Sequence, residues 1–200
     1  MHAAPPPVSP EERLRRNGHR GAVVWITGLS GAGKTTLALA AERALFQRGC
    51  QVVVLDGDRV RQGLCADLGF TLSERSENIR RIAAVAQLFF DAGQIVLVSA
   101  ISPLRADRAA ARALIPSPHF IEVHCHCLLA VCEARDAKGL YRKARAGLLP
   151  EFTGISSPYE APIAPEVLVD SAASQVEQEV ERLLGELEGR GLIPLSPAIL

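Results

Sequence analysis

Short apolar runs alternate along the chain with longer stretches that repeat apolar residues at helical spacing. The apolar runs are rich in Val, Ile and Leu, which is typical of strands buried on both faces of a parallel sheet. The predicted strands cover residues 22–27, 51–56, 94–100, 119–127 and 166–171. The predicted helices cover residues 34–48, 58–66, 73–93, 104–115, 128–137 and 175–191. In the long third helix, Ser73 is the expected N-cap, Ser76 is the alternative, and Gly93 ends the helix.

The regular alternation of strand and helix predicts one α/β domain in three layers, with a parallel, mostly five-stranded sheet covered by helices on both faces. Ligands of such sheets bind at the carboxyl ends of the strands. We therefore expect the chemistry around Gly28, Asp56 and Ser99, where three of the predicted strands end.

Two segments lack the periodicity of a packed element. Residues 1–20 contain three consecutive prolines followed by charges, so we expect a flexible arm there. Residues 138–165 are rich in basic residues, glycine and proline, so we expect a mobile basic loop. The expected organisation is an arm over residues 1–20, one domain over 21–190 and a tail over 191–200.

Composition narrows the classes of function and location. The 22 Lys and Arg residues equal the 22 Asp and Glu residues, so nothing predicts a nucleic-acid or membrane surface. The arginines are nevertheless clustered between positions 59 and 81, which suits a small anionic ligand better than a polymer. The five cysteines follow no disulfide spacing and the N-terminus has no signal-peptide pattern, which predicts reduced thiols in the cytoplasm. No apolar run is long enough to cross a bilayer.

Residues 28–36, GLSGAGKTT, match the phosphate-binding loop G-x-x-x-x-G-K-[ST] between a predicted strand and a predicted helix. Backbone N–H groups of such a loop cradle phosphates, and the positive end of the following helix adds to the attraction. The predicted ATP-binding residues are Gly28, Leu29, Ser30, Gly31, Ala32, Gly33, Lys34, Thr35 and Thr36. We expect Lys34 to reach the β- and γ-phosphates and Thr35 to offer its hydroxyl to Mg²⁺.

The loop alone leaves several classes of protein open. A glycine-rich turn with a chance lysine matches the same letters, although the flanking strand and helix argue against it. The motif also does not separate a kinase from an ATPase, a GTPase or a motor. The absence of a guanine-reading N-K-x-D motif counts against a GTPase.

Asp56 and Asp58 form an acidic turn at the end of the second predicted strand. A phosphoryl-transfer enzyme needs a carboxylate to accept the proton of the attacking hydroxyl, and oxygen or water ligands around Mg²⁺. Asp58 is the candidate base, and Asp56 is a candidate Mg²⁺ ligand acting through water. The alternative is an Asx turn that only caps the next helix.

A group of basic, aromatic and amide residues follows the acidic turn, at Arg61, Phe70, Arg75 and Asn78. Arg75 and Asn78 lie three residues apart and therefore share a helix face. Arginines bind oxygen anions through forked hydrogen bonds, and a phenylalanine can stack on a base. The alternative is an ordinary solvated basic face.

Taken in order, several strings resemble the adenylyl-sulfate kinase (APS kinase) family. They are GLSGAGKTT, LDGDxxR, LGFTLSERSENIRRIAAVAQLFFDAG, ISPLRADR, CEARDAKGLYRKARAGLLPEFTGI and PYEAP. The resemblance covers about residues 21–170. It implies a P-loop kinase fold with a basic lid and the transfer of the ATP γ-phosphoryl group to the 3′-hydroxyl of adenosine 5′-phosphosulfate (APS). The product would be PAPS, in sulfate assimilation, with Mg²⁺ as cofactor and a homodimer as the expected assembly.

The resemblance also implies roles for single residues. Lys34, Asp58 and Ser102 would be catalytic, with Asp58 taking the proton of the 3′-hydroxyl. The implied substrate-binding residues are Asp58, Arg61, Phe70, Arg75, Asn78, Ile101, Ser102, Lys138 and Phe152. A serine at the position of Ser102 is often described as a phosphoserine intermediate; because direct in-line transfer needs no covalent stop, a purely substrate-binding serine is the alternative. Phe70 and Phe152 are expected to sandwich an adenine, under a lid that excludes water.

Three positions depart from the family pattern. Arg59 and Cys65 stand where the family usually has Asn, and Ser156 stands where the lid usually has Asp. None of the three replaces a group that we assign to the chemistry.

A run of histidines and cysteines looks at first like a metal site. It consists of His124, Cys125, His126 and Cys127, with Cys132 nearby. Because neighbours on a strand point to opposite faces, we predict buried thiols and packed histidines instead of a zinc site. Trp25, in the first predicted strand, is expected in the core.

Two rival functions remain open on the sequence. One is another small-molecule P-loop kinase, which would not explain Phe70, Arg75 and Asn78 together. The other is a nucleotide-binding regulator without turnover, which the intact Lys34 and Asp58 argue against.

Overall fold

The computed structural model describes residues 7–195 and contains a parallel five-stranded sheet. Its strands are β1 (Ala22–Thr27), β2 (Val52–Asp56), β3 (Ile95–Ser99), β4 (Phe120–His126) and β5 (Val167–Asp170). They lie in the order β2-β3-β1-β4-β5, and every neighbouring pair is parallel. The five predicted strands and the α/β class are thus confirmed.

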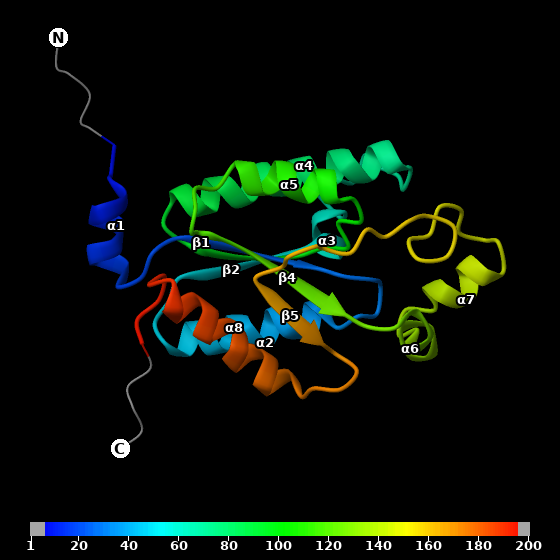
Figure 1. Cartoon of the computed structure of the whole chain (residues 1–200). Helices are drawn as coiled ribbons and strands as arrows, with labels where there is room; N and C mark the ends of the chain where they lie inside the picture. Colours follow the sequence, from blue (N-terminus) through cyan, green and yellow to red (C-terminus); the bar gives the residue numbers. More distant parts are fainter. Residues whose placement is uncertain (1–6, 196–200) are drawn as a thin grey trace, which may run out of the picture.

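Helices cover both faces of the sheet, as Figure 1 shows. Helices α4 (Leu72–Asp91) and α5 (Arg105–Ala113) lie on one face, and α2 (Lys34–Gln47) and α8 (Val176–Gly189) on the other. Each face has its own apolar cluster of buried residues. The sheet is therefore the middle of three layers, which explains why its strands are apolar on both sides.

The central strand β1 is buried at all six positions because strands flank both of its edges and helices cover both of its faces. Trp25 is fully buried and stacks on Phe120 of β4 with ring centroids 6.0 Å apart. Trp25 is a core residue, as predicted. The rigid strand in turn fixes the loop that follows it.

Three short helices gather at the carboxyl ends of the strands: α3 (Gly57–Val60), α6 (Leu129–Arg135) and α7 (Leu140–Arg145). Helices α6 and α7 lie beyond the tips of β4 and β5 in Figure 1. The predicted helix over 58–66 is correct only at its start, because turns follow α3. Helix α7 lies in the segment that was expected to be a mobile loop.

The start of α4 differs from the prediction. Its N-cap is Thr71, not Ser73 or Ser76. Glu74 stands three residues after Thr71, and the two side chains form a reciprocal capping box with each other's backbone N–H groups. The helix starts where an N-cap residue has an acidic partner three residues later. Neither Ser73 nor Ser76 has such a partner, so neither is the N-cap.

The expected N-terminal arm contains the helix α1 (Pro10–Asn17). A Ser9–Glu12 capping box starts it, with Pro10 in the first helical turn. Arg13 and Asn17 donate hydrogen bonds to the carbonyls of Ala92 and Gly93, which attaches α1 to the end of α4. Residues 1–6 lie outside the described residues.

The described part of the expected tail, residues 191–195, also contacts the domain. Leu192 and Ile193 are buried, and the Arg20 N–H donates to the Leu192 carbonyl over 2.9 Å. That the domain ends at residue 190 and a tail begins at residue 191 stays a prediction. Residues 196–200 lie outside the described residues. No helix within residues 7–195 has the length and apolar character needed to span a membrane.

Candidate functional site

The loop between β1 and α2 has the backbone of a phosphate cradle. Gly28 and Gly33 have φ values of 155° and 87°. A Cβ on Gly28 would lie 2.5 Å from the Cys125 carbonyl oxygen, so only glycine fits there. No side chain caps the N-terminus of α2, which leaves the N–H groups of its first turn free for an anion.

Lys34 is a buried cation at this N-terminus. The residue is 9% exposed, and its Nζ donates to the Leu29 carbonyl over 2.7 Å. Burial is the main cause that lowers the pKa of Lys34 to about 8. Within residues 7–195 the structure describes no ion pair for Lys34. A polyanion in the cradle would supply the missing countercharge, so the residues fit ATP phosphates.

Thr35 and Asp56 bring oxygen atoms together beside the cradle. The Thr35 hydroxyl donates to Asp56 Oδ2 over 2.8 Å and lies 3.3 Å from the Ser99 hydroxyl. Asp56 Oδ1 accepts the N–H groups of Asp58 and Arg59 and so caps α3. Hydroxyl and carboxylate oxygens fit Mg²⁺, and the full engagement of Asp56 fits a contact through water.

Asp58 follows on α3 and points to solvent, with its side chain 65% exposed. Its carboxylate forms an ion pair with the ammonium group of Lys138, which lies between α6 and α7. Among the charges that act on Lys34, Asp58 raises its pKa and Lys138 lowers it. The three groups therefore share one site, although they come from three separate segments of the chain.

Arg61, Phe70 and Arg75 form a second cluster, near Asp58. The guanidinium carbons of Arg61 and Arg75 lie 4.4 Å and 5.4 Å from the centre of the Phe70 ring. Phe70 remains 56% exposed. Arg75 is anchored by the carbonyls of Phe70 and Glu151 at 2.8 Å and 2.9 Å. The cluster presents an aromatic ring with two cations beside it.

Asn78 lies on the same face of α4 as Arg75, as the spacing predicted, and both side chains are buried. No hydrogen-bond partner is described for Asn78 Oδ1 within residues 7–195. Buried amide oxygens normally have a partner. A binding pocket leaves such an oxygen without a partner when the ligand supplies the missing hydrogen-bond donor. The unpaired Asn78 Oδ1, on the same helix face as Arg75, fits that role.

Ile101 and Ser102 lie just after β3. The Ile101 carbonyl accepts the Thr27 hydroxyl over 2.6 Å. Ser102 is 1% exposed, and its hydroxyl accepts the Trp25 indole N–H over 3.1 Å. The hydroxyl of Ser102 therefore points into the core, and only a rearrangement would bring it to a nucleotide.

Phe152 lies against another lid residue, and its expected sandwich of an adenine with Phe70 stays a prediction. Its ring is 9% exposed and packs edge-on against Tyr141, with centroids 5.1 Å apart. The backbone N–H of Phe152 donates to the Ser156 hydroxyl over 2.9 Å. The serine that departs from the family pattern thus holds the lid turn together.

The comparisons with known proteins agree with this geometry. The family model described as "Adenylylsulphate kinase" matches residues 20–170. The chain is 57% identical to the adenylyl-sulfate kinase of Geotalea daltonii over 90% of this chain and 89% of the relative. It is 54% identical to that of Shewanella amazonensis over 94% of both chains.

The chain belongs to the adenylyl-sulfate kinase family. A solved structure of the Mycobacterium tuberculosis APS kinase in complex with AMPPNP and APS has a TM-score of 0.81 to this chain. The two are 46% identical over 85% of this chain and 99% of the other. The three-layer P-loop kinase fold predicted from the sequence is confirmed.

Two residues of this adenylyl-sulfate kinase family member support the cradle and were missed by the sequence reasoning. The Tyr141 hydroxyl donates to the Ser30 carbonyl over 2.8 Å, and burial raises the pKa of Tyr141. Arg135 donates to Gly31 and Ser171 oxygens at 3.4 Å and 2.7 Å. Both lie in CEARDAKGLY, a string that carried the resemblance, but no spacing rule links them to the phosphate loop.

Cys125, Cys127 and Cys132 are buried, as predicted, and so is His124, but His126 is exposed because it ends β4. The Cys125 thiol donates to the Ala32 carbonyl over 2.9 Å, below the phosphate loop. Burial raises the pKa of Cys125 to about 12. Within residues 7–195 no group of three or more His, Cys, Asp and Glu side chains is arranged to hold a metal. These thiols act as packing groups.

Proposed function

We propose that the protein transfers the γ-phosphoryl group of ATP to the 3′-hydroxyl of adenosine 5′-phosphosulfate, giving PAPS for sulfate assimilation in the cytoplasm. The observation that carries the proposal is the position of Asp58. Its charge acts both on Lys34 of the phosphate cradle and on Arg61 of the aromatic cluster. The carboxylate is therefore near both the lysine that would bind the phosphoryl donor and an arginine that would bind an aromatic, anionic acceptor.

On the donor side, the backbone of residues 28–36 and the Lys34 ammonium bind the ATP phosphates. Lys34 offsets the charge on the oxygens of the transferred group. The Thr35 hydroxyl and Asp56, through water, would hold Mg²⁺, which would neutralise part of the phosphate charge.

On the acceptor side, Phe70 stacks on the adenine and Arg61 and Arg75 attract the phosphosulfate and the ring. Asn78 Oδ1 takes a donor group of the ligand as its missing partner. Ile101 lines the same side. This set of residues selects a nucleotide that carries extra negative charge, which is the chemistry of APS.

Asp58 then orients the 3′-hydroxyl for in-line attack and accepts its proton. In the structure the Asp58 carboxylate is paired with the Lys138 ammonium group. Exchange of that ion pair for a contact with nucleotide frees Asp58 to act as base and leaves Lys138 to bind phosphate charge. Closure of the lid over residues 138–156 excludes water and so favours transfer over hydrolysis of ATP.

The proposal is tested by an assay that offers ATP and Mg²⁺ with a panel of acceptors: APS, AMP, adenosine, gluconate and shikimate. We expect APS to exceed every other acceptor in kcat/KM by a wide margin. A sugar acid or plain nucleotide as the best acceptor would favour the rival small-molecule kinase. Tight ATP binding without any transfer would favour a regulator.

A homodimer and the kinase domain over residues 21–190 are further parts of the proposal. Size-exclusion chromatography with light scattering measures the mass of the assembly and so tests the homodimer. Limited proteolysis with mass spectrometry tests the domain bounds, with cleavage expected outside residues 21–190.

A further inference from the structure

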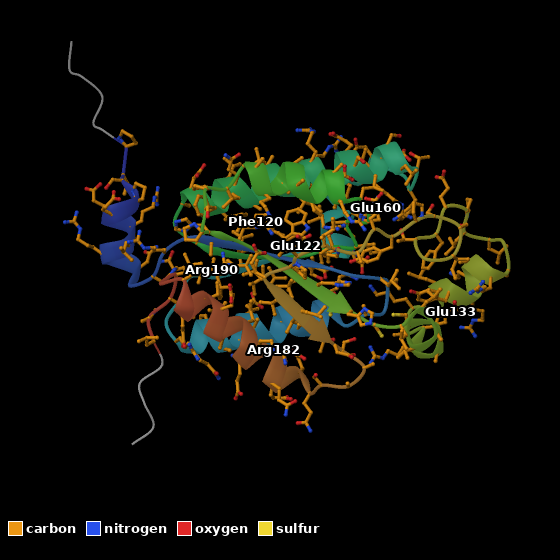
Figure 2. The ribbon with its side chains drawn as sticks, viewed as in Figure 1. Phe120, Glu122, Glu133, Glu160, Arg182 and Arg190 are labelled. Carbon is orange, nitrogen blue, oxygen red and sulfur yellow. The ribbon has the colours of Figure 1, made fainter. Side chains whose placement is uncertain are left out.

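Arg108 of α5 is a buried cation that joins three separate segments. Its side chain is 2% exposed. It donates to Glu122 Oε1 over 2.7 Å, to the Ser102 carbonyl over 2.6 Å and to the Glu160 carbonyl over 2.7 Å. Figure 2 shows Glu122 on the sheet and Glu160 on the segment that returns from the lid. One guanidinium group thus connects the sheet, the loop after β3 and the lid return.

Thr27, at the end of β1, makes matching contacts from the other side. Its hydroxyl donates to the Ile101 carbonyl at 2.6 Å and also lies 3.4 Å from the Ser102 carbonyl. It is 3.1 Å from the Tyr159 hydroxyl. We call residues 101–103 the acceptor loop and residues 159–160 the lid return. Both are held by the same two buried side chains.

The acceptor loop needs such support because its backbone is strained. Ser102 has a φ of 40°, a conformation that residues with a side chain rarely adopt. Such a conformation persists only where the surroundings impose it. Arg108 holds the carbonyl of Ser102, and Trp25 holds its hydroxyl. Loss of the Arg108 contacts lets the loop relax and moves Ile101 with it.

We propose that Arg108 is a positioning residue for the acceptor nucleotide, acting through the acceptor loop and the lid return. The inference rests on the proposed function, because it takes the acceptor loop as part of the APS pocket. None of the contacts described for Arg108 involves residues 28–36. Its effect is therefore specific to the acceptor and spares the binding of ATP.

The first test is Arg108→Lys. Lysine keeps the charge that pairs with Glu122, but its ammonium cannot hold two carbonyls and a carboxylate in a fixed fork. We expect KM for APS to rise about tenfold or more, as displacement of a positioned substrate does. The dissociation constant of AMPPNP, measured by calorimetry, should stay within about twofold of the unaltered protein.

Arg112→Gln is the matched control. Arg112 lies one turn further along α5 and forms a forked ion pair with Glu166 at 2.7 Å and 2.8 Å. No contact described for it reaches the acceptor loop or the lid return. Its loss should lower the melting temperature without changing KM for APS. An equal rise of KM in both variants would overturn the inference, because it would show a general loss of stability.

Thr27→Val keeps the proposal falsifiable if Arg108→Lys does not fold. Valine has nearly the shape of threonine but removes the hydroxyl that donates to the Ile101 carbonyl, and strand pairing still holds the backbone. We expect KM for APS to rise and AMPPNP affinity to stay unchanged; an unchanged KM in a folded Thr27→Val protein would overturn the inference. If the unaltered protein does not phosphorylate APS, the proposed function fails and the inference fails with it. If the unaltered protein phosphorylates APS and neither variant changes KM for APS, the inference fails and the proposed function stands.

Discussion

Lys138 and Asp58 lie 80 residues apart in the chain, yet their side chains form an ion pair. The pair connects the lid to the acidic turn after β2. The two side chains are 60% and 65% exposed. Exposed pairs contribute only about 0–1 kcal/mol to stability, so this one is easily exchanged for contacts with a ligand. The functional value of the two residues can therefore be tested without unfolding the protein.

Asp58→Asn should lower kcat while leaving substrate binding almost intact. Asparagine still orients a hydroxyl but cannot take its proton, and general base catalysis contributes roughly two to four orders of magnitude. Steady-state kinetics with APS and ATP measure kcat and both KM values. Unchanged turnover would remove Asp58 from the role of base.

Arg59→Asn is the control for that variant, since Asn is the residue usual in the family at this position. The hydrogen bonds described for Arg59 are those of its backbone, from its N–H to Asp56 and to its carbonyl from the Gln62 N–H, and any residue retains them. Its side chain is exposed. We expect kcat of Arg59→Asn within about threefold of the unaltered protein, as is usual for a surface change away from reacting groups.

Lys138→Met should leave the melting temperature unchanged and lower kcat/KM about tenfold or more, since it removes one charge from the site that holds the phosphates. Thermal unfolding and kinetics measure the two effects. Lys143→Met, on the same lid in α7, is the matched control because the structure describes no ion pair for Lys143 within residues 7–195. Equal losses in both variants would show that only the overall charge of the lid matters.

ATP binding should take up protons in mildly basic solution. Burial lowers the pKa of Lys34 to about 8, and phosphates in the cradle stabilise its charged form and raise that pKa. Binding therefore favours protonated Lys34, and affinity falls as pH rises through about 8 and above. Calorimetry at about pH 8.5 in buffers of different ionisation enthalpy measures the uptake.

Lys34→Arg tests the source of those protons. Arginine stays charged throughout this pH range, so its complex with ATP should form without uptake. The same uptake in Lys34→Arg would assign the protons to another group. Lys34→Ala should abolish transfer, because the charge that develops on the γ-phosphoryl group then has no cation beside it.

The sheet was predictable from the sequence because its strands are buried on both faces and read as runs of Val, Ile and Leu. Helices α1 and α7 were missed because they are short and lie in segments rich in proline, glycine and charged residues. Local side chains stabilise each: Ser9 and Glu12 cap α1, and the Asp136 carboxylate accepts the N–H groups of the first turn of α7. Capping contacts of this kind stabilise the start of a short helix.

The candidate site was predictable where one short motif contains both the backbone geometry and the side chain, as at Lys34 and Thr35. The orientations of Phe152 and Ser102 were not, because partners distant in sequence determine them. Tyr141 holds the ring of Phe152, and Trp25 holds the hydroxyl of Ser102. A motif records which residue is present but not which way it points.

Ser102→Ala should retain most of kcat, because the Ser102 hydroxyl is engaged by the Trp25 indole and points into the core. Its removal leaves a buried N–H group without a partner, which costs about 1–3 kcal/mol and lowers the melting temperature by roughly 3–10 °C. Incubation with ATP radiolabelled in the γ-phosphate should leave no acid-stable label on the unaltered protein. A labelled Ser102, or a folded Ser102→Ala protein without turnover, would instead support a phosphoserine intermediate and require the acceptor loop to open during the reaction.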